Sequence, residues 1–191
     1  MPELKDTDTS FRSIVKLPFS ITGGSLIDFE TVGIPGRRTV QDIVTFGYIV
    51  GSEVTIVQRR SRDKAQYYAL IRQIVNGLPR PFYSNNVPFE LSVIKEELSL
   101  SISLRHFVNI MEPYKTRAEK LGLNWPKPEE LVSEPEDYFN ERKVPDKNVL
   151  QLWSTFLKTG KRQFLKPIMN HCQSDIMREA TILLYSSLQN K

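Results

Sequence analysis

Two carboxylates one residue apart, Asp28 and Glu30, follow the apolar run Ser25-Leu26-Ile27. Because the side chains of a strand alternate between its two faces, both carboxylates project from the same face. Buried like charges at that separation repel each other and resist desolvation unless a cation lies between them. A divalent metal ion is one solution. A strand end with one carboxylate capping a turn and the other solvated is the simpler interpretation, which the dipeptide spacing alone favours.

A second acidic position lies in the segment Asn86-Val87-Pro88-Phe89-Glu90, after a short strand expected over 81–83. Pro88 can start a helix, so Glu90 belongs to its first turn, where the helix dipole favours a negative charge. Asn86 is a candidate cap of this helix and Phe89 a candidate anchor. Taken alone, Glu90 is best explained as an acid that complements the dipole.

A third pair, His171 and Asp175, is spaced four residues apart in a helix expected over 168–188. Residues at this spacing share one face of a helix. An imidazole one turn from a carboxylate can position or deprotonate a water molecule. The simpler alternative is a surface ion pair that contributes about 0.2–0.5 kcal/mol.

The elements that must position these residues are predicted from the hydrophobic pattern. Strands are expected over 23–29, 43–50, 53–58 and 81–83, with a hairpin turn at 51–52. Helices are expected from 63, from 88, over 149–158 and over 168–188, whereas 106–111 has no firm assignment. This order predicts an α/β fold, a mixed sheet covered by helices. A doubly wound dinucleotide fold is not expected, because no Gly-x-Gly-x-x-Gly turn follows the first strand.

The chain of 191 residues is expected to form a single domain over 1–191, with an N-terminal arm over 1–22 and a Pro/Glu-rich surface loop over 121–142. The apolar runs are too short for a bilayer, and the start of the chain lacks the pattern of a signal peptide. The single cysteine, Cys172, suits a reducing compartment, so a cytoplasmic location without membrane contact is expected. With one Cys and two His, a Cys/His zinc site is nearly excluded, so any metal must be held by oxygen.

The net charge of +4 and the pI of about 9.1 fit a nucleic-acid partner without requiring one. The cations gather in three clusters: Arg37-Arg38; Arg59, Arg60, Arg62 and Lys64; and Lys158, Lys161, Arg162 and Lys166. Taken singly, each cluster is better explained as a solvated face that keeps the protein soluble.

Taken together, the acidic segments resemble the three motifs of the DEDD-type 3′-5′ exonucleases of the ribonuclease H-like superfamily. The motifs are Asp28-x-Glu30-Thr31, Asn86-x-x-Phe89-Glu90 and His171-x-x-x-Asp175. They occur in the family's order between about residues 23 and 188. They are most similar to those of uncharacterised ribonuclease H-like exonuclease domains whose third motif is His-Asn-x-x-Asp. The resemblance implies a mixed five-stranded sheet flanked by helices, with a helical C-terminal third.

The resemblance also implies a site that binds two Mg²⁺ or Mn²⁺ ions through four carboxylates: Asp28, Glu30, Glu90 and Asp175. His171 takes the general-base position of the family. Thr31, Asn86 and Phe89 would bind the substrate, although packing in the core is the better explanation for Phe89. The implied activity is divalent-metal-dependent 3′-5′ exonucleolytic hydrolysis of single-stranded DNA or RNA.

Two departures from the family pattern bear on that activity. Glu90 stands where the second motif usually has Asp, and Mg²⁺ requires near-ideal geometry, so the longer side chain must be accommodated. Cys172 stands where Asn is expected, which affects efficiency more than chemistry. These departures motivate the alternative of a weak or inactive nucleic-acid-binding or scaffold subunit of a repair or helicase complex, docked through the 121–142 loop. DNA or RNA, exonuclease or endonuclease, and the oligomeric state stay open.

Overall fold

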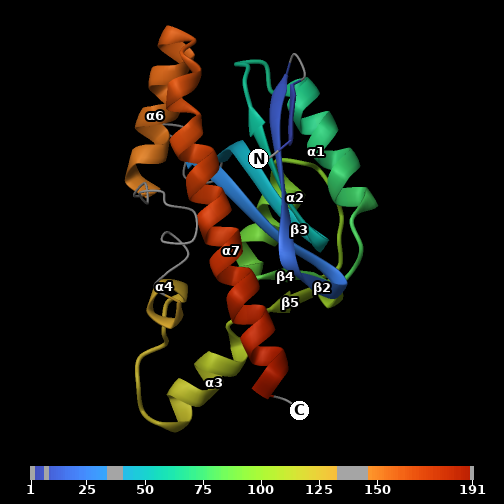
Figure 1. The fold of residues 1–191 in the computed structure, drawn as a ribbon, viewed down its shortest axis with the longest axis vertical. Helices are drawn as coiled ribbons and strands as arrows, with labels where there is room; N and C mark the ends of the chain where they lie inside the picture. Colours follow the sequence, from blue (N-terminus) through green and yellow to red (C-terminus); the bar gives the residue numbers. More distant parts are fainter. Residues whose placement is uncertain (1–2, 7–8, 34–40, 133–145, 190–191) are drawn as a thin grey trace.

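The computed structural model describes the whole chain except residues 1–2, 7–8, 34–40, 133–145 and 190–191. Its centre is a five-stranded mixed sheet with helices on both faces (Figure 1). The strands are β1 (Glu3–Asp6), β2 (Ser10–Gly33), β3 (Gln41–Arg59), β4 (Phe82–Ser84) and β5 (Phe107–Asn109). This α/β architecture is the one that the sequence predicts.

The pairing of the strands makes the sheet mixed. β2 pairs antiparallel with β1 and β3 and parallel with β4, and β4 pairs parallel with β5. The two halves of β3 lie side by side. This is shown by the Gln58 side-chain amide, which donates to the Val44 carbonyl at 2.9 Å although the two residues are 14 apart in the chain. Gly51 makes the bend with a φ of +59°. The predicted hairpin over 43–58 is therefore confirmed.

The strand composition differs from the prediction in its first part. β1 and the first half of β2 lie in the segment expected as an arm over 1–22, and the strand expected over 23–29 is only part of β2. Register shifts interrupt the pairing of β2 with β3 between Lys16 and Leu26. The predicted strand therefore began at a bend inside a longer strand, where Gly23 and Gly24 have φ values of +72° and +153°.

Six helices are described: α1 (Ala65–Gly77), α2 (Val87–Glu96), α3 (Glu112–Lys120), α4 (Pro128–Leu131), α6 (Asp146–Thr159) and α7 (Lys166–Gln189), with 3₁₀ turns η1 (Leu104–His106) and η2 (Arg162–Phe164). α1, α2, α6 and α7 confirm the four predicted helices. α3 is unpredicted, since it buries only Ala118 and lacks an apolar stripe. α4 lies in the predicted surface loop, of which 133–142 is outside the described residues. No described helix is long and apolar enough to cross a lipid bilayer.

The two faces of the sheet carry separate hydrophobic cores. On one face α1 and α2 pack on Ile27 and Phe29, and on the other α7 packs on Leu26. The alternation of β2 side chains therefore sends Asp28, two residues after Leu26, toward α7. In Figure 1, α7 crosses this second face along the length of the sheet. A third core lies between α6 and the sheet around Trp153.

Close packing of α7 on β3 depends on Gly47. A Cβ atom at this position would lie 2.7 Å from the Cys172 Sγ atom, 3.1 Å from Ile56 Cδ1 and 3.3 Å from Ile176 Cδ1. Real Cβ atoms essentially never approach an atom as closely as 2.7 Å. The absence of a side chain at Gly47 therefore sets how near α7 lies to the strands.

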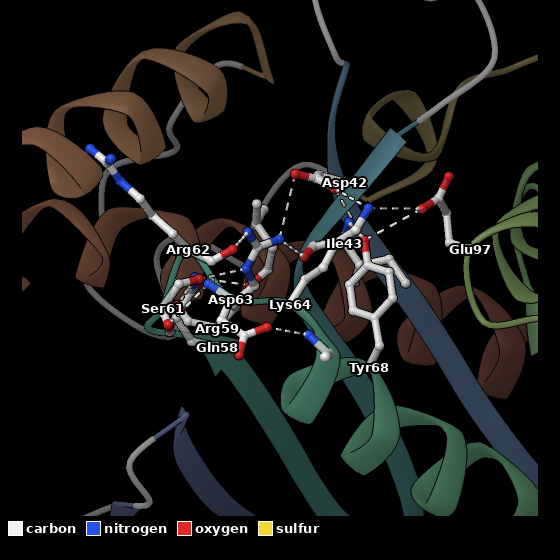
Figure 2. A network of polar contacts seen from close by, with 12 residues as sticks. Asp42, Ile43, Gln58, Arg59, Ser61, Arg62, Asp63, Lys64, Tyr68 and Glu97 are labelled. Atoms are coloured by element: carbon white, nitrogen blue, oxygen red, sulfur yellow. Dashed lines mark hydrogen bonds and ion pairs between the residues drawn. The ribbon is translucent and has the colours of Figure 1, made fainter.

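Arg59, Arg62 and Lys64 of the second basic cluster belong to a network of polar contacts at the start of α1 (Figure 2). Arg59 is 2% exposed and donates to the carbonyl oxygens of Ser61 and Arg62 at 2.7 and 3.0 Å. Its guanidinium lies 3.6 Å from the Asp42 carboxylate, which also accepts from Lys64 at 2.9 Å. For Arg59 the prediction of a solvated face is wrong, because its charge is satisfied inside the protein. Arg37 and Arg38 lie outside the described residues.

Candidate metal centre

β2 presents Asp28 and Glu30 to α7, on the same face of the strand. Asp28 pairs with Gly47 and Glu30 pairs with Thr45. Phe29 points to the opposite face, where its ring stacks on that of Phe46 at 4.4 Å. A register shift follows Glu30 directly, and such irregularities re-aim side chains at functional sites. The two carboxylates of the first motif therefore share one face, as the alternation predicts.

α7 brings the third motif onto these carboxylates. The His171 Nε2 atom lies 3.6 Å from Glu30 Oε1 and 3.4 Å from Asp175 Oδ2. The imidazole is only 2% exposed, whereas the side chains of Glu30 and Asp175 are 14% and 24% exposed. The first and third motifs, 141 residues apart from Glu30 to His171 (171 minus 30), thus meet in space.

Glu90 comes to the same place from the first turn of α2 and is 2% exposed. Burial raises the pKa of this carboxyl group well above its usual value, and the nearby charges of Asp28, Glu179 and Glu30 raise it further. Its Oε2 atom has no hydrogen-bond partner within the described part of the chain. The Glu90 carboxyl group also accepts a hydrogen bond from the Phe29 backbone, so it lies beside the strand that carries Asp28 and Glu30.

Cys172, the second departure from the family pattern, lies beside Asp28. Its thiol donates to Asp28 Oδ2 across 3.5 Å. Burial, followed by the charges of Asp28 and Glu30, raises the pKa of the thiol well above its usual value, so it stays protonated and able to donate. Cys172 thus orients Asp28.

Sequence reasoning missed two residues of the site, Arg178 and Glu179. The Arg178 guanidinium donates to Asp175 Oδ1 and holds that carboxylate, while its Nε atom donates to the Val132 carbonyl at 3.3 Å. Glu179 Oε2 accepts the backbone N–H of Asn85 at 3.3 Å. Their positions three and four residues after Asp175, on the same face of a helix, would have identified both.

The three predicted substrate-binding residues lie around the acids with different exposures. Thr31 is partly buried in β2 after the register shift, and Asn86 is exposed. Asn86 is the N-cap residue of α2, as predicted, but its side chain makes no capping hydrogen bond to the helix. Phe89 packs against the same core as Phe29, in agreement with its core interpretation.

The donor atoms fit a hard divalent cation. Among the described residues, two groups have donor atoms that lie within 4.8 Å of one another inside each group. One group is Asp28, Glu30 and Cys172, the other is Glu30, His171 and Asp175, and Glu90 belongs to neither. Carboxylate oxygens predominate, which suits Mg²⁺ or Mn²⁺. The buried Glu90 Oε2 and Glu179 Oε1 atoms lack hydrogen-bond partners among the described residues. Buried carboxyl groups of this kind either bind a proton, as their raised pKa values reflect, or need a counter-charge that a metal ion would supply.

The raised pKa of Glu90 predicts a pH-dependent effect of Glu90→Gln in EDTA. Since the native state binds this proton more tightly than the unfolded state, wild-type stability falls as pH rises from the usual pKa near 4.5 through the native pKa. The variant lacks this loss. The free energy of unfolding of the variant minus that of wild type should therefore increase with rising pH in that window, by at most about 1.4 kcal/mol per pH unit. Urea unfolding at a series of pH values measures the difference, and a pH-independent difference would contradict the prediction.

A comparison with family models matches residues 26–189 to the RNase H superfamily. The match covers most of the chain, including both β2 carboxylates, Glu90 and the α7 pair, so this chain belongs to the RNase H superfamily. Comparisons with curated proteins and with solved structures gave no match. Membership of this superfamily indicates a nuclease-type function on nucleic acid.

Proposed function

We propose that this protein is a divalent-metal-dependent nuclease of the DEDD type that removes nucleotides from the 3′ ends of single-stranded DNA or RNA. The observation that carries the proposal is the convergence of acids from three distant segments, β2, α2 and α7, with His171 beside them. Neither the two β2 carboxylates nor the α7 pair alone would distinguish a site from an ordinary surface.

The carboxylates of Asp28, Glu30, Glu90 and Asp175 would hold two Mg²⁺ or Mn²⁺ ions. Bound there, the ions would supply Lewis-acid stabilisation of the charge that develops on the phosphate in the transition state. Cys172 and Arg178 fix the carboxylates of Asp28 and Asp175 through one oxygen of each. Orientation by such supporting contacts preorganises ligands before the metal binds.

His171 would serve as the general base. Its Nε2 atom faces both Glu30 and Asp175, so it is placed to take a proton from water held among the acids. Thr31, directly after the first motif, would contact the terminal nucleotide.

Cleavage of 5′-labelled single-stranded DNA and RNA of one sequence tests the activity. In Mn²⁺ or Mg²⁺ we expect a ladder of products shortened from the 3′ end, abolished by EDTA. A substrate blocked at its 3′ end and a circular single strand should both resist. Cleavage of the circle would instead show an endonuclease. Binding that is insensitive to EDTA, without cleavage of any substrate, would support a non-catalytic nucleic-acid-binding subunit.

A metal centre also predicts stabilisation by the ions alone. Free of metal, the carboxylates repel one another, and an ion that binds only the native state stabilises it by about 2.7 kcal/mol at 100 times its Kd. For a chain of this length that corresponds to a rise in Tm of about 5–10 °C. Thermal unfolding in EDTA and in millimolar Mn²⁺ measures the shift, with NaCl of equal ionic strength as the control. An unchanged Tm in Mn²⁺ would count against the metal centre.

A further inference from the structure

The carboxylate of Glu179 is buried beside the acids of the three motifs. Its residue is 1% exposed. The Oε2 atom accepts the Asn85 N–H at 3.3 Å, whereas the Oε1 atom has no hydrogen-bond partner among the residues that the structure describes. One oxygen is thus held by the β4–α2 connection and the other is without a donor.

Glu179 lies on α7 and is held by the connection into α2, so it joins two elements that carry acids of the proposed centre. Glu179 lies one helical turn beyond Asp175 on α7. After burial, the charges of Asp28 and Asp175 are the next largest causes that raise its pKa, and Glu179 in turn raises the pKa of Glu90. The hydrogen bond from Asn85 ties the Glu179 carboxylate to the connection that leads into α2, and Glu90 lies in the first turn of that helix.

A purely structural role does not explain a carboxylate here. Accepting the Asn85 N–H requires only a neutral acceptor such as the amide oxygen of Gln. A negative charge adds repulsion toward Asp28 and Asp175, which the neighbouring Arg178 offsets only in part. A divalent ion at the Oε1 atom would reverse the balance, because the charge would then attract rather than repel.

We propose that Glu179 is a fifth carboxylate ligand of the divalent-metal centre, binding the ion through Oε1 while Asn85 holds Oε2. The inference rests on the proposed metal-dependent function. It adds a ligand on α7 to the motif residues, and it ties the ion to the connection that leads into α2 and carries Glu90 toward the site.

The Glu179→Gln variant tests the proposal without any nucleic acid. Titration calorimetry with Mn²⁺ should give a Kd at least about 10-fold weaker than that of wild type. In EDTA the Tm of the variant should equal or exceed that of wild type, because a repelling charge is removed. An unchanged Kd would overturn the proposal, and so would a lower Tm in EDTA, which would show that the charge stabilises the protein without metal.

Two further variants keep the test decisive. Glu96→Gln removes an exposed carboxylate from α2 and should leave the Kd and both melting temperatures unchanged. If Glu179→Gln does not fold, Glu179→Asp keeps the charge but retracts it by one methylene, and an unweakened Kd in that variant overturns the inference. Wild type that binds no Mn²⁺ would overturn the metal centre and this ligand together. If wild type binds Mn²⁺ and Glu179→Gln binds it equally well, the metal centre stands and only the role of Glu179 as a ligand is overturned.

Discussion

The Asp28→Asn variant is expected to lose Mn²⁺-dependent cleavage of a single-stranded oligonucleotide, by about 100-fold or more. Asp28 belongs to a set of metal-donor atoms with Glu30 and Cys172, and its carboxylate accepts the Cys172 thiol. Loss of residues that merely orient metal ligands costs about 10–100-fold, and loss of a ligand itself should cost at least the upper end of that range. Initial rates on a 5′-labelled strand, at saturating Mn²⁺, measure the effect.

The variant should remain folded, which makes the result interpretable. Asn can still accept the Cys172 thiol, and it removes one charge from a repelling group. Its Tm in EDTA should therefore not fall below that of wild type. Asp63→Asn is the matched control, because Asp63 is exposed and accepts the Ala65 N–H, which Asn can also do. Wild-type rates in Asp28→Asn would show that the acids of β2 do not form the site.

Gly47→Ala is expected to destabilise the protein through a single methyl group. The new Cβ would lie 2.7 Å from Cys172 Sγ, so α7 or the strand must move. Overpacking of a core typically costs about 1–3 kcal/mol. A cost of about 2 kcal/mol, at about 2–4 °C per kcal/mol for a chain of this length, lowers the Tm by about 4–8 °C. Thermal and urea unfolding in EDTA measure this loss.

A second substitution should recover part of that loss. Cys172→Ala removes the Sγ atom that the new methyl group meets, so the double variant should be more stable than the sum of the two single effects predicts. Gly33→Ala is the control, since no described atom would lie within 4 Å of its Cβ. Strict additivity of Gly47→Ala and Cys172→Ala would contradict the close approach of α7 to β3.

The parts of the fold that the sequence predicted correctly are those governed by local periodicity. Alternation placed Asp28 and Glu30 on one face, and the helical repeat placed His171 and Asp175 together. The β3 hairpin and helices α1, α2, α6 and α7 carried apolar patterns of the right period. The motifs themselves, in order, indicated the superfamily that the comparison then established.

Where local patterns were weak or misleading, the predictions were incomplete or wrong. α3 has no apolar stripe, and the arm over 1–22 lacks a clean alternation although most of its described part is strand. Arg59 belongs to a run of cations, yet the carbonyl oxygens and Asp42 around it allow it to be buried. Asn86 is a favoured capping residue in the right place, but its side chain makes no such bond to α2.

The sequence alone determined which residues have the chemistry of a metal centre and which of them share a strand or helix face, because these depend on residue type and on the repeat of one element. Only the tertiary structure decided that Glu90 is buried beside β2, that Glu179 is buried against the β4–α2 connection, and that Gly47 lets Cys172 lie against Asp28. These are contacts between elements far apart in the chain. Their distances are set by how closely α7 and α2 pack on the sheet, which no local pattern encodes.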